Sequence, residues 1–167
     1  MSRAFVKEPD GDQADTDLPE RPQSGLPNYI SPTGLARLND RLGELSRERD
    51  ALKADDSLAA KNRLKPVEQE LRYLQQRVQA AIPIDPATQP ADAIRFGATV
   101  DLLGEDNKKY TFTIVGEDEA DPANNRISWA SPLAKALMGK QIDDVVIWER
   151  PNGELELEIA GFEYRNR

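Results

Sequence analysis

The feature that most constrains this chain is a pair of leucine-rich runs with the periodicity of a coiled coil. In the first run, leucines recur every three or four residues from Leu35 to Leu45 and return at Leu52. The second run repeats the spacing from Leu64 to Ala81. This spacing places apolar side chains on one face of an α-helix, and that face must be buried against a partner. Two such helices with a short linker predict an antiparallel hairpin.

The ends of the two runs indicate how the hairpin is built. Ser31 followed by Pro32 is typical of a helix start, because the hydroxyl caps a free N–H and proline suits the first helical position. The first helix then runs to about Lys53, which gives an arm of roughly 35 Å at 1.5 Å per residue. Pro66 lies inside the second run and removes one helical hydrogen bond. We therefore expect a short turn over 57–64 that kinks into the second helix.

Past a proline-rich linker, the apolar pattern changes to that of β-strands. The dipeptide Asn152-Gly153 is a strong two-residue hairpin turn between two such strands. Ser131-Pro132 begins a short helix that Gly139 ends. The strands are predicted in the segments FGATVDLL, KYTFTIVG, NRISW, DVVIWE and ELELEIAGFEY.

These patterns predict an α+β fold, with an N-terminal antiparallel helical coiled-coil hairpin and a C-terminal, mainly antiparallel five-stranded sheet with one short helix. The first residues are polar and acidic with little to bury, which is typical of disorder. The expected segments are a disordered acidic leader (1–28), the hairpin (29–81), a linker (82–94) and the sheet domain (95–167).

Composition excludes several classes of chemistry. The chain has neither Cys nor His, which rules out disulfides, the usual zinc sites and nucleophiles paired with histidine. A net charge of −8 argues against a protein that coats nucleic acid. The sequence shows no apolar run of membrane-spanning length and no secretory signal. We therefore expect a cytoplasmic protein that binds no membrane.

Three segments in the C-terminal half carry a family resemblance. In order, YTFTIVGEDEAD, ISWASPLAKALMGKQIDD and VVIWERPNGELELEIAGFEY resemble the C-terminal domain of the bacterial GreA/GreB transcript-cleavage factors. The resemblance extends over about Tyr29 to Tyr164. It implies an FKBP-like sheet domain that binds the rim of the RNA polymerase secondary channel, and a hairpin that inserts toward the active centre. It also implies a protein that is not an enzyme on its own.

The resemblance assigns roles to two groups of residues. At the hairpin tip, Asp55 and Asp56 would act in catalysis as ligands of Mg²⁺, and only within the polymerase active centre, with nascent RNA nearby. No cofactor is expected on the isolated chain. The polymerase contact maps onto Asp118, Glu119, Asp121, Ser128, Ser131 and Pro132. Without the resemblance, these last residues would be interpreted as a solvated loop.

The tip departs from the family pattern Gly-Asp-x-x-Glu-Asn-Ala-x-Tyr. Leu58 or Ala59 stands where glutamate is expected, and the tyrosine is absent. The arm also looks shorter than in the family by about two turns per helix. Three interpretations of the two aspartates stay open: helix capping alone, contact with the active centre without efficient cleavage, and full stimulation of cleavage.

The expected function is that of a monomeric transcription elongation factor that binds RNA polymerase and regulates elongation, with stimulated cleavage of backtracked RNA as one form of that activity. The alternatives are a regulator that occupies the channel without cleavage, a hairpin-mediated dimerising module and an FKBP-like prolyl isomerase. The last needs an aromatic-lined pocket, for which this chain has few residues. Basic residues of the arm face either RNA or the channel wall, or only solvent (Lys53, Lys61, Arg63 and Lys65).

Overall fold

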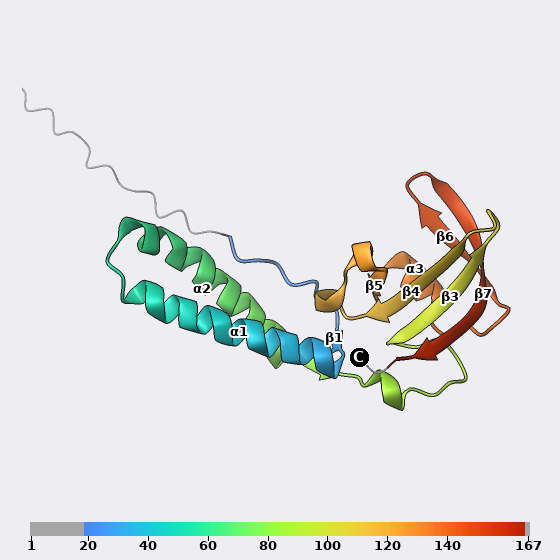
Figure 1. The fold of residues 1–167 in the computed structure, drawn as a ribbon, viewed down its shortest axis with the longest axis horizontal. Coiled ribbons are helices and arrows are strands. Elements are labelled where there is room, and N and C mark those ends of the chain that lie inside the picture. Colours follow the sequence, from blue (N-terminus) through green and yellow to red (C-terminus); the bar gives the residue numbers. More distant parts are fainter. Residues whose placement is uncertain (1–18, 166–167) are drawn as a thin grey trace, which may run out of the picture.

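The computed structural model describes residues 19–165; residues 1–18 and 166–167, which include most of the expected leader, lie outside it. It shows a two-helix arm that projects from a body built on a curled sheet (Figure 1). None of the helices among the described residues is long and apolar enough to cross a membrane.

The arm is the predicted antiparallel hairpin. Helix α1 spans Pro32–Lys53 and helix α2 spans Leu58–Gln79. The Ser31 side chain accepts a hydrogen bond from the Gly34 N–H and caps α1, as its position before Pro32 predicts. The coiled-coil core consists of predicted seam residues joined by Tyr73: Leu38, Leu42, Leu45, Leu52, Val67, Leu71 and Leu74.

Helix α2 differs from the expectation around Pro66. A single α-helix begins at Leu58 and continues through Pro66, so the expected separate turn over 57–64 is wrong. The proline leaves one carbonyl of the preceding turn without its helical N–H. Ala60 and Val67, on either side of it, are both buried. Tertiary packing of this face therefore holds the helix together where local propensity would interrupt it.

The body is a five-stranded sheet in the order β5-β4-β3-β7-β6. All neighbouring pairs are antiparallel except β4 and β5, which are parallel, so the predicted mainly antiparallel α+β fold is confirmed. The short helix α3 (Pro132–Leu137) packs next to β6. The strands are β3 (Ala98–Gly104), β4 (Lys109–Val115), β5 (Arg126–Ser128), β6 (Val145–Arg150) and β7 (Gly153–Tyr164).

One face of this sheet forms the main hydrophobic core. Alternate residues of the central strands point into it, and Leu133 and Leu137 of α3 close it. Its members from the sheet include Val100, Leu102, Phe112, Ile114, Val146, Leu155, Leu157 and Ile159. The alternate residues on the opposite face are a mixture of polar side chains, such as Asp101 and Thr111, and apolar ones, such as Leu103, Val145 and Ile147.

A second, two-stranded sheet at the base of the arm was not predicted. Strand β1 (Asn28–Ile30) pairs in parallel with β2 (Ala81–Pro83). Asn28 was expected in the leader and the region after Ala81 in the linker, so both of these boundaries shift. The 3-10 helix η1 (Pro86–Thr88) also lies in the expected linker. Strands this short carry too little periodicity to be recognised from sequence.

The described part of the leader lies along α2. Glu20 forms an ion pair with Arg72, with 2.7 Å between the carboxylate oxygen and the guanidinium nitrogen. The Arg21 guanidinium stacks over the Tyr73 ring at 4.0 Å from its centroid. Gln23 donates a hydrogen bond to Gln76. This extended segment thus follows the arm toward the body (Figure 1).

Candidate functional site

The two predicted tip acids differ in their surroundings. The Asp55 carboxylate accepts a hydrogen bond from the backbone N–H of Ser57, with an N–O distance of 2.8 Å. This hydrogen bond lowers the pKa of Asp55 below its ordinary value. Ser57, and not either aspartate, caps α2, because its hydroxyl accepts from the Ala60 N–H. Asp55 therefore stabilises the tip turn rather than the helix end.

Asp56 is the free acid of the tip. It is exposed, and no hydrogen bond or ion pair joins its carboxylate to another residue in the described part of the chain. Next to it, the Leu58 side chain is 71% exposed at the first position of α2. The tip thus presents one available carboxylate beside one exposed leucine.

Within residues 19–165, no group of three or more His, Cys, Asp or Glu side chains is arranged to hold a metal ion. Magnesium prefers several oxygen ligands. Asp56 alone fits the role of a single extra ligand to an ion that is held mainly by another molecule.

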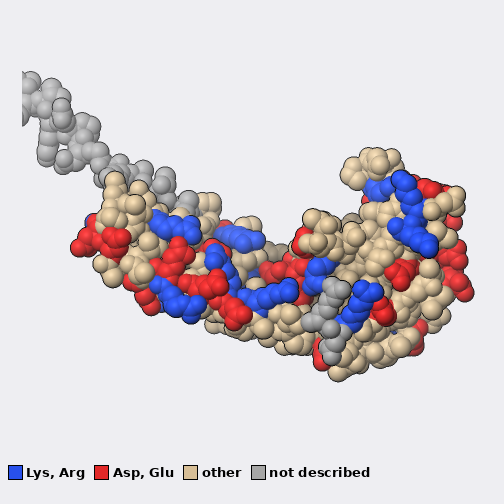
Figure 2. Space-filling model, in the orientation of Figure 1, with Lys and Arg blue, Asp and Glu red and all other residues tan. Residues whose placement is uncertain are grey.

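Two of the basic residues near the tip form ion pairs within the arm. Arg63 pairs with Glu48 at 2.9 Å and Lys53 with Glu68 at 3.6 Å, while Lys61 and Lys65 are exposed. Figure 2 shows Lys and Arg interleaved with Asp and Glu along the arm, and acidic residues at its free end. The arm therefore has no continuous basic stripe on this face of the kind that binds nucleic acid.

The predicted partner-binding residues lie at one end of β4 and β5, where the arm joins the body. The 3-10 helix η2 (Glu117–Glu119) follows β4, and η3 (Pro122–Asn124) leads into β5. Residue pairing of Val115 with Ser128 brings the end of β5 beside the start of this loop. The structure thus brings the six predicted residues to one region.

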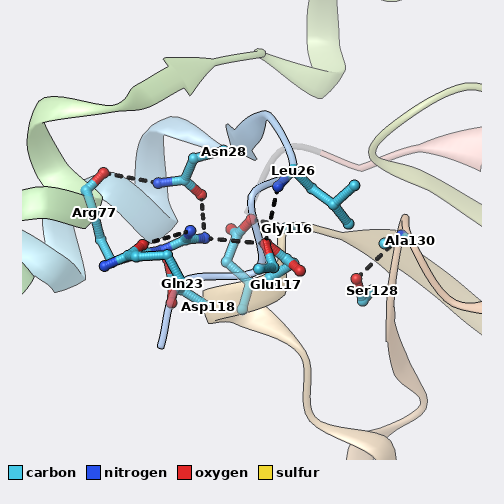
Figure 3. Close-up of polar contacts among 11 residues, drawn as sticks. Gln23, Leu26, Asn28, Arg77, Gly116, Glu117, Asp118, Ser128 and Ala130 are labelled. Atoms are coloured by element: carbon cyan, nitrogen blue, oxygen red, sulfur yellow. Dashed lines mark hydrogen bonds and ion pairs between the residues drawn. The ribbon is translucent and has the colours of Figure 1, made fainter. Parts of the chain in front are cut away.

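Within this region, Asp118 contacts the arm. Its carboxylate lies 2.7 Å from the Nε of Arg77, near the end of α2, and its side chain is only 12% exposed. The Arg77 side chain is 4% exposed; it also lies 3.4 Å from Glu117 and donates to the Asn28 side chain at 2.6 Å (Figure 3). Asn28 in turn donates to the Arg77 carbonyl. We call these four residues the Arg77 cluster.

The charge of Arg77 is held in place by its acidic neighbours. Burial by itself lowers the pKa of the guanidinium, but the hydrogen bond and charge of Asp118 and the charges of Tyr73 and Glu117 together raise it above its ordinary value. The arginine therefore stays protonated and ties α2 to η2. Ser24, from the described part of the leader, donates to Glu117 and extends the same contact.

Glu119 makes a second connection between arm and body. Its carboxylate accepts hydrogen bonds from the Ser31 hydroxyl, from the Ser31 N–H at 3.1 Å and from the Gly116 N–H at 3.0 Å. Gly34 lies so close to Glu119 that a Cβ at this position would overlap the carboxylate. Glu119 thus reinforces the N-terminus of α1, where a negative charge is favourable.

The other predicted residues lie in the body, and their hydrogen bonds within residues 19–165 do not reach the arm. Asp121 accepts a hydrogen bond from the Asn124 side chain at 2.7 Å. Ser128 accepts from the Ala130 N–H and Ser131 caps α3, while Pro132 is exposed. Asp121, Ser128 and Ser131 are partly buried, and we call these three residues together with Pro132 the α3 surface.

Sequence reasoning missed Arg77 and Asn28. An arginine in a heptad helix is ordinarily solvated, and its partner Asp118 is 41 residues away. The only local signal is that Arg77 sits one residue before the seam position Val78, which places it near the buried face.

The cavity where the arm meets the sheet bears on the isomerase alternative. Among its lining residues, Phe96 is the single aromatic, beside Thr99, Thr113, Arg126 and Glu119. A prolyl-isomerase site needs an aromatic-lined pocket, so this cavity does not support that alternative.

Comparisons with known proteins agree in pointing to one family. A sequence model described as "Transcription elongation factor, GreA/GreB, C-term" matches residues 89–164. The transcription elongation factor GreB of Neisseria meningitidis serogroup B is 39% identical over 153 residues, which cover 82% of this chain and 94% of the relative. GreA of Zymomonas mobilis is 36% identical, covering 78% of this chain and 87% of the relative.

Solved structures are less similar to this chain in sequence than these relatives are. GreA/GreB from Nitrosomonas europaea is 24% identical with a TM-score of 0.42, covering 81% of this chain and 98% of that one. Gfh1 of Thermus aquaticus is 22% identical with a TM-score of 0.41, covering 81% and 97%.

Proposed function

The chain belongs to the GreA/GreB family of transcription elongation factors, and on that premise we propose that it binds bacterial RNA polymerase and regulates elongation from the secondary channel. The observation that carries the proposal is the shape of the molecule: a stiff arm with a free carboxylate at its tip, fixed to a body that presents the α3 surface beside its base. The arm and the body would act together, one inserted and one docked.

The α3 surface is proposed to dock on the polymerase. Asp121 is its acidic member, and Pro132 and the serines give it hydrogen-bonding and apolar atoms. Asp118 and Glu119, which the resemblance also assigns to this contact, already bind Arg77 and Ser31. Their role is to fix the arm against the body, so that docking of the body on the polymerase also positions the arm.

At the tip, Asp56 would be the residue that contributes to a Mg²⁺ held in the polymerase active centre. Such an ion, when bound, activates a water for attack on a phosphodiester. Asp55 holds the turn through Ser57, and Asp56 beside it is exposed. The chain would then supply one ligand and no nucleophile of its own, and so would not be an enzyme alone.

The second form of the proposal, a regulator that occupies the channel without cleavage, is favoured by the tip and by the length of the arm. Each helix of the arm has 22 residues. The alignment with the Neisseria relative has 153 positions, and 82% of this chain is about 137 of its 167 residues. About 16 positions of the alignment therefore have no counterpart in this chain. Two turns missing from each helix would account for about 14 residues.

A cleavage assay on backtracked complexes of the cognate polymerase tests the proposal. We expect the chain to bind the polymerase, and Asp121→Asn to weaken this binding by about threefold, the loss of one surface contact. If transcripts are shortened, Asp56→Asn should reduce the rate by at least about tenfold, whereas Asp55→Asn should reduce it less. Binding without shortening, together with inhibition of a cleavage-competent relative, would select the occupying regulator.

The control for both aspartate variants is binding to polymerase, which neither should change. Absence of binding by the folded wild-type chain would overturn the proposed function in both of its forms.

A further inference from the structure

Strand β6 forms an unpaired edge of the main sheet. It is the last strand in the order β5-β4-β3-β7-β6 and pairs only with β7 among the strands of the described residues. Figure 1 shows it in the upper part of the body, beside β7. Its register with β7 runs without a bulge from Val145 to Arg150. It is therefore a straight edge that a further strand can extend.

The outward backbone groups of β6 can be assigned from its turn. Arg150 and Gly153 close a two-residue hairpin, and such a pair exchanges both of its hydrogen bonds with each other. The pattern alternates, so Val145, Ile147 and Glu149 direct their N–H and C=O groups away from β7. No backbone hydrogen bond from any other part of residues 19–165 satisfies them.

The same residues leave apolar surface exposed. Val145 and Ile147 are 51% and 56% exposed, and Ile142, just before the strand, is 52% exposed. Natural edge strands are commonly protected by lysine, proline or a bulge. Over residues 145–148 of β6 there is none of these.

An acidic row lies directly inside this apolar edge. On β7, Glu158 is opposite Val145 and Glu156 is opposite Ile147, and both glutamates are exposed. Glu154 continues the row opposite Glu149, the acidic residue of β6 itself. Strands are spaced by about 4.8 Å, so a lysine on an added strand would lie about 10 Å from the row. Its alkyl chain can cross the apolar edge and place its ammonium near the carboxylates.

We propose that β6 is a docking edge for an extended partner segment in which Lys or Arg alternates with apolar residues. The main-chain groups of Val145, Ile147 and Glu149 would bind its backbone, and the glutamates of β7 would select its charge. A second copy of this chain is the less favourable occupant, because its own edge is acidic and the chain carries a net charge of −8. This docking edge lies apart from the α3 surface and the tip, so it goes beyond the proposed function.

The test uses the isolated full chain and a short synthetic peptide of alternating Lys and Val with blocked ends. We expect saturable binding below about 1 mM by fluorescence anisotropy, weakened by salt. We also expect slower amide exchange on binding at Val145, Ile147 and Glu149, with little change at Val146 and Trp148. A Glu-Val peptide should not bind.

Variants separate the backbone contribution from the charge contribution. Ile147→Pro removes one outward N–H and leaves the pairing with β7 intact, so it should abolish binding. Glu156→Gln should weaken binding by about two- to fivefold, the effect of one exposed charge pair. Asp40→Asn on the arm removes the same charge far from β6 and is the matched control, which should bind normally. The circular dichroism spectrum verifies the fold of each variant.

Several results would overturn the proposal. One is absence of binding at low salt, and another is equal binding by folded Ile147→Pro, which would show attraction by charge alone. Concentration-dependent dimers of the wild type that Val145→Lys dissociates would show that the edge serves a second copy instead. None of these outcomes depends on RNA polymerase, so the test stands apart from that of the proposed function.

Discussion

At the scale of single residues, the most consequential side chain is Arg77. Its guanidinium is buried at the junction between arm and body, where it forms ion pairs with Asp118 and Glu117 and donates a hydrogen bond to Asn28. A buried charge loses its hydration, so it is tolerated only because these partners replace the lost water. Removal of one member therefore harms the fold more than removal of the charges together.

Substitution of Arg77 tests this dependence. We expect Arg77→Met to lower the free energy of unfolding by about 3 kcal/mol, because it leaves the Asp118 carboxylate without its partner. The double variant Arg77→Met, Asp118→Asn should recover part of the loss. Urea denaturation measures both, and Arg37→Ala, an exposed arginine of α1, should change stability by less than about 0.5 kcal/mol. Equal losses in the single and double variants would contradict the argument.

The tip aspartates give a second prediction at this scale. The hydrogen bond from Ser57 lowers the pKa of Asp55, so the tip turn is stabilised above the ordinary aspartate pKa and loses that stabilisation as the pH falls through the lowered value. In an NMR titration, the Ser57 amide should shift with a midpoint below about 3.9, the ordinary value. Asp55→Asn should abolish this shift and Asp56→Asn should retain it. An unchanged midpoint in Asp55→Asn would disprove the assignment.

At the scale of elements, α2 shows tertiary packing prevailing over local preference. Pro66 belongs by propensity at a helix end, and the helix nevertheless continues through it because Val67 packs in the arm core and Ala60 is buried. The predicted interruption was therefore wrong although the predicted helix was confirmed. Much of β7, by contrast, follows its sequence pattern closely, since Leu155, Leu157 and Ile159 are buried between exposed glutamates.

Pro66→Ala measures how much the proline destabilises the continuous helix α2. Alanine restores the missing N–H, and after allowance for the freer unfolded chain we expect a stabilisation of about 2 kcal/mol. Thermal unfolding should show this as a higher Tm. Gln75→Ala, an exposed site on the same helix, controls for helix propensity and should change stability little. A destabilised Pro66→Ala would show that the arm needs the proline geometry.

At the scale of the whole molecule, three contacts set the direction of the arm. They are the Arg77 cluster, the hydrogen bonds from Ser31 to Glu119 at the start of α1, and the pairing of β1 with β2. The first joins α2 to the 3-10 helix η2 (Figure 3), and the second joins the start of α1 to the same 3-10 helix. A partner that docks on the α3 surface would therefore meet the arm in a defined orientation.

Spin-label distances between Ala54→Cys at the tip and Lys108→Cys in the body test this rigidity, and the chain has no native cysteine to interfere. We expect a single narrow distribution. The double variant Asp118→Asn, Glu119→Gln should broaden it, because both polar connections to η2 are weakened. Asp121→Asn in the same loop should leave it narrow. An unaltered distribution in the double variant would assign the orientation to β1 and β2 alone.

The sequence by itself determined the elements whose signals are local. Heptad leucines specify the hairpin and alternating residues specify the strands, because neighbouring side chains on one helix or strand face share one environment. The β6–β7 turn was predicted one residue too late: Gly153 pairs with Arg150, so Pro151 and Asn152 form the two-residue loop. The tertiary structure alone decided the burial of Arg77, the inward roles of Asp118 and Glu119 and the pairing of β1 with β2. Each joins residues that are distant along the chain, Arg77 and Asp118 being 41 residues apart, and no local pattern of side chains encodes such a meeting.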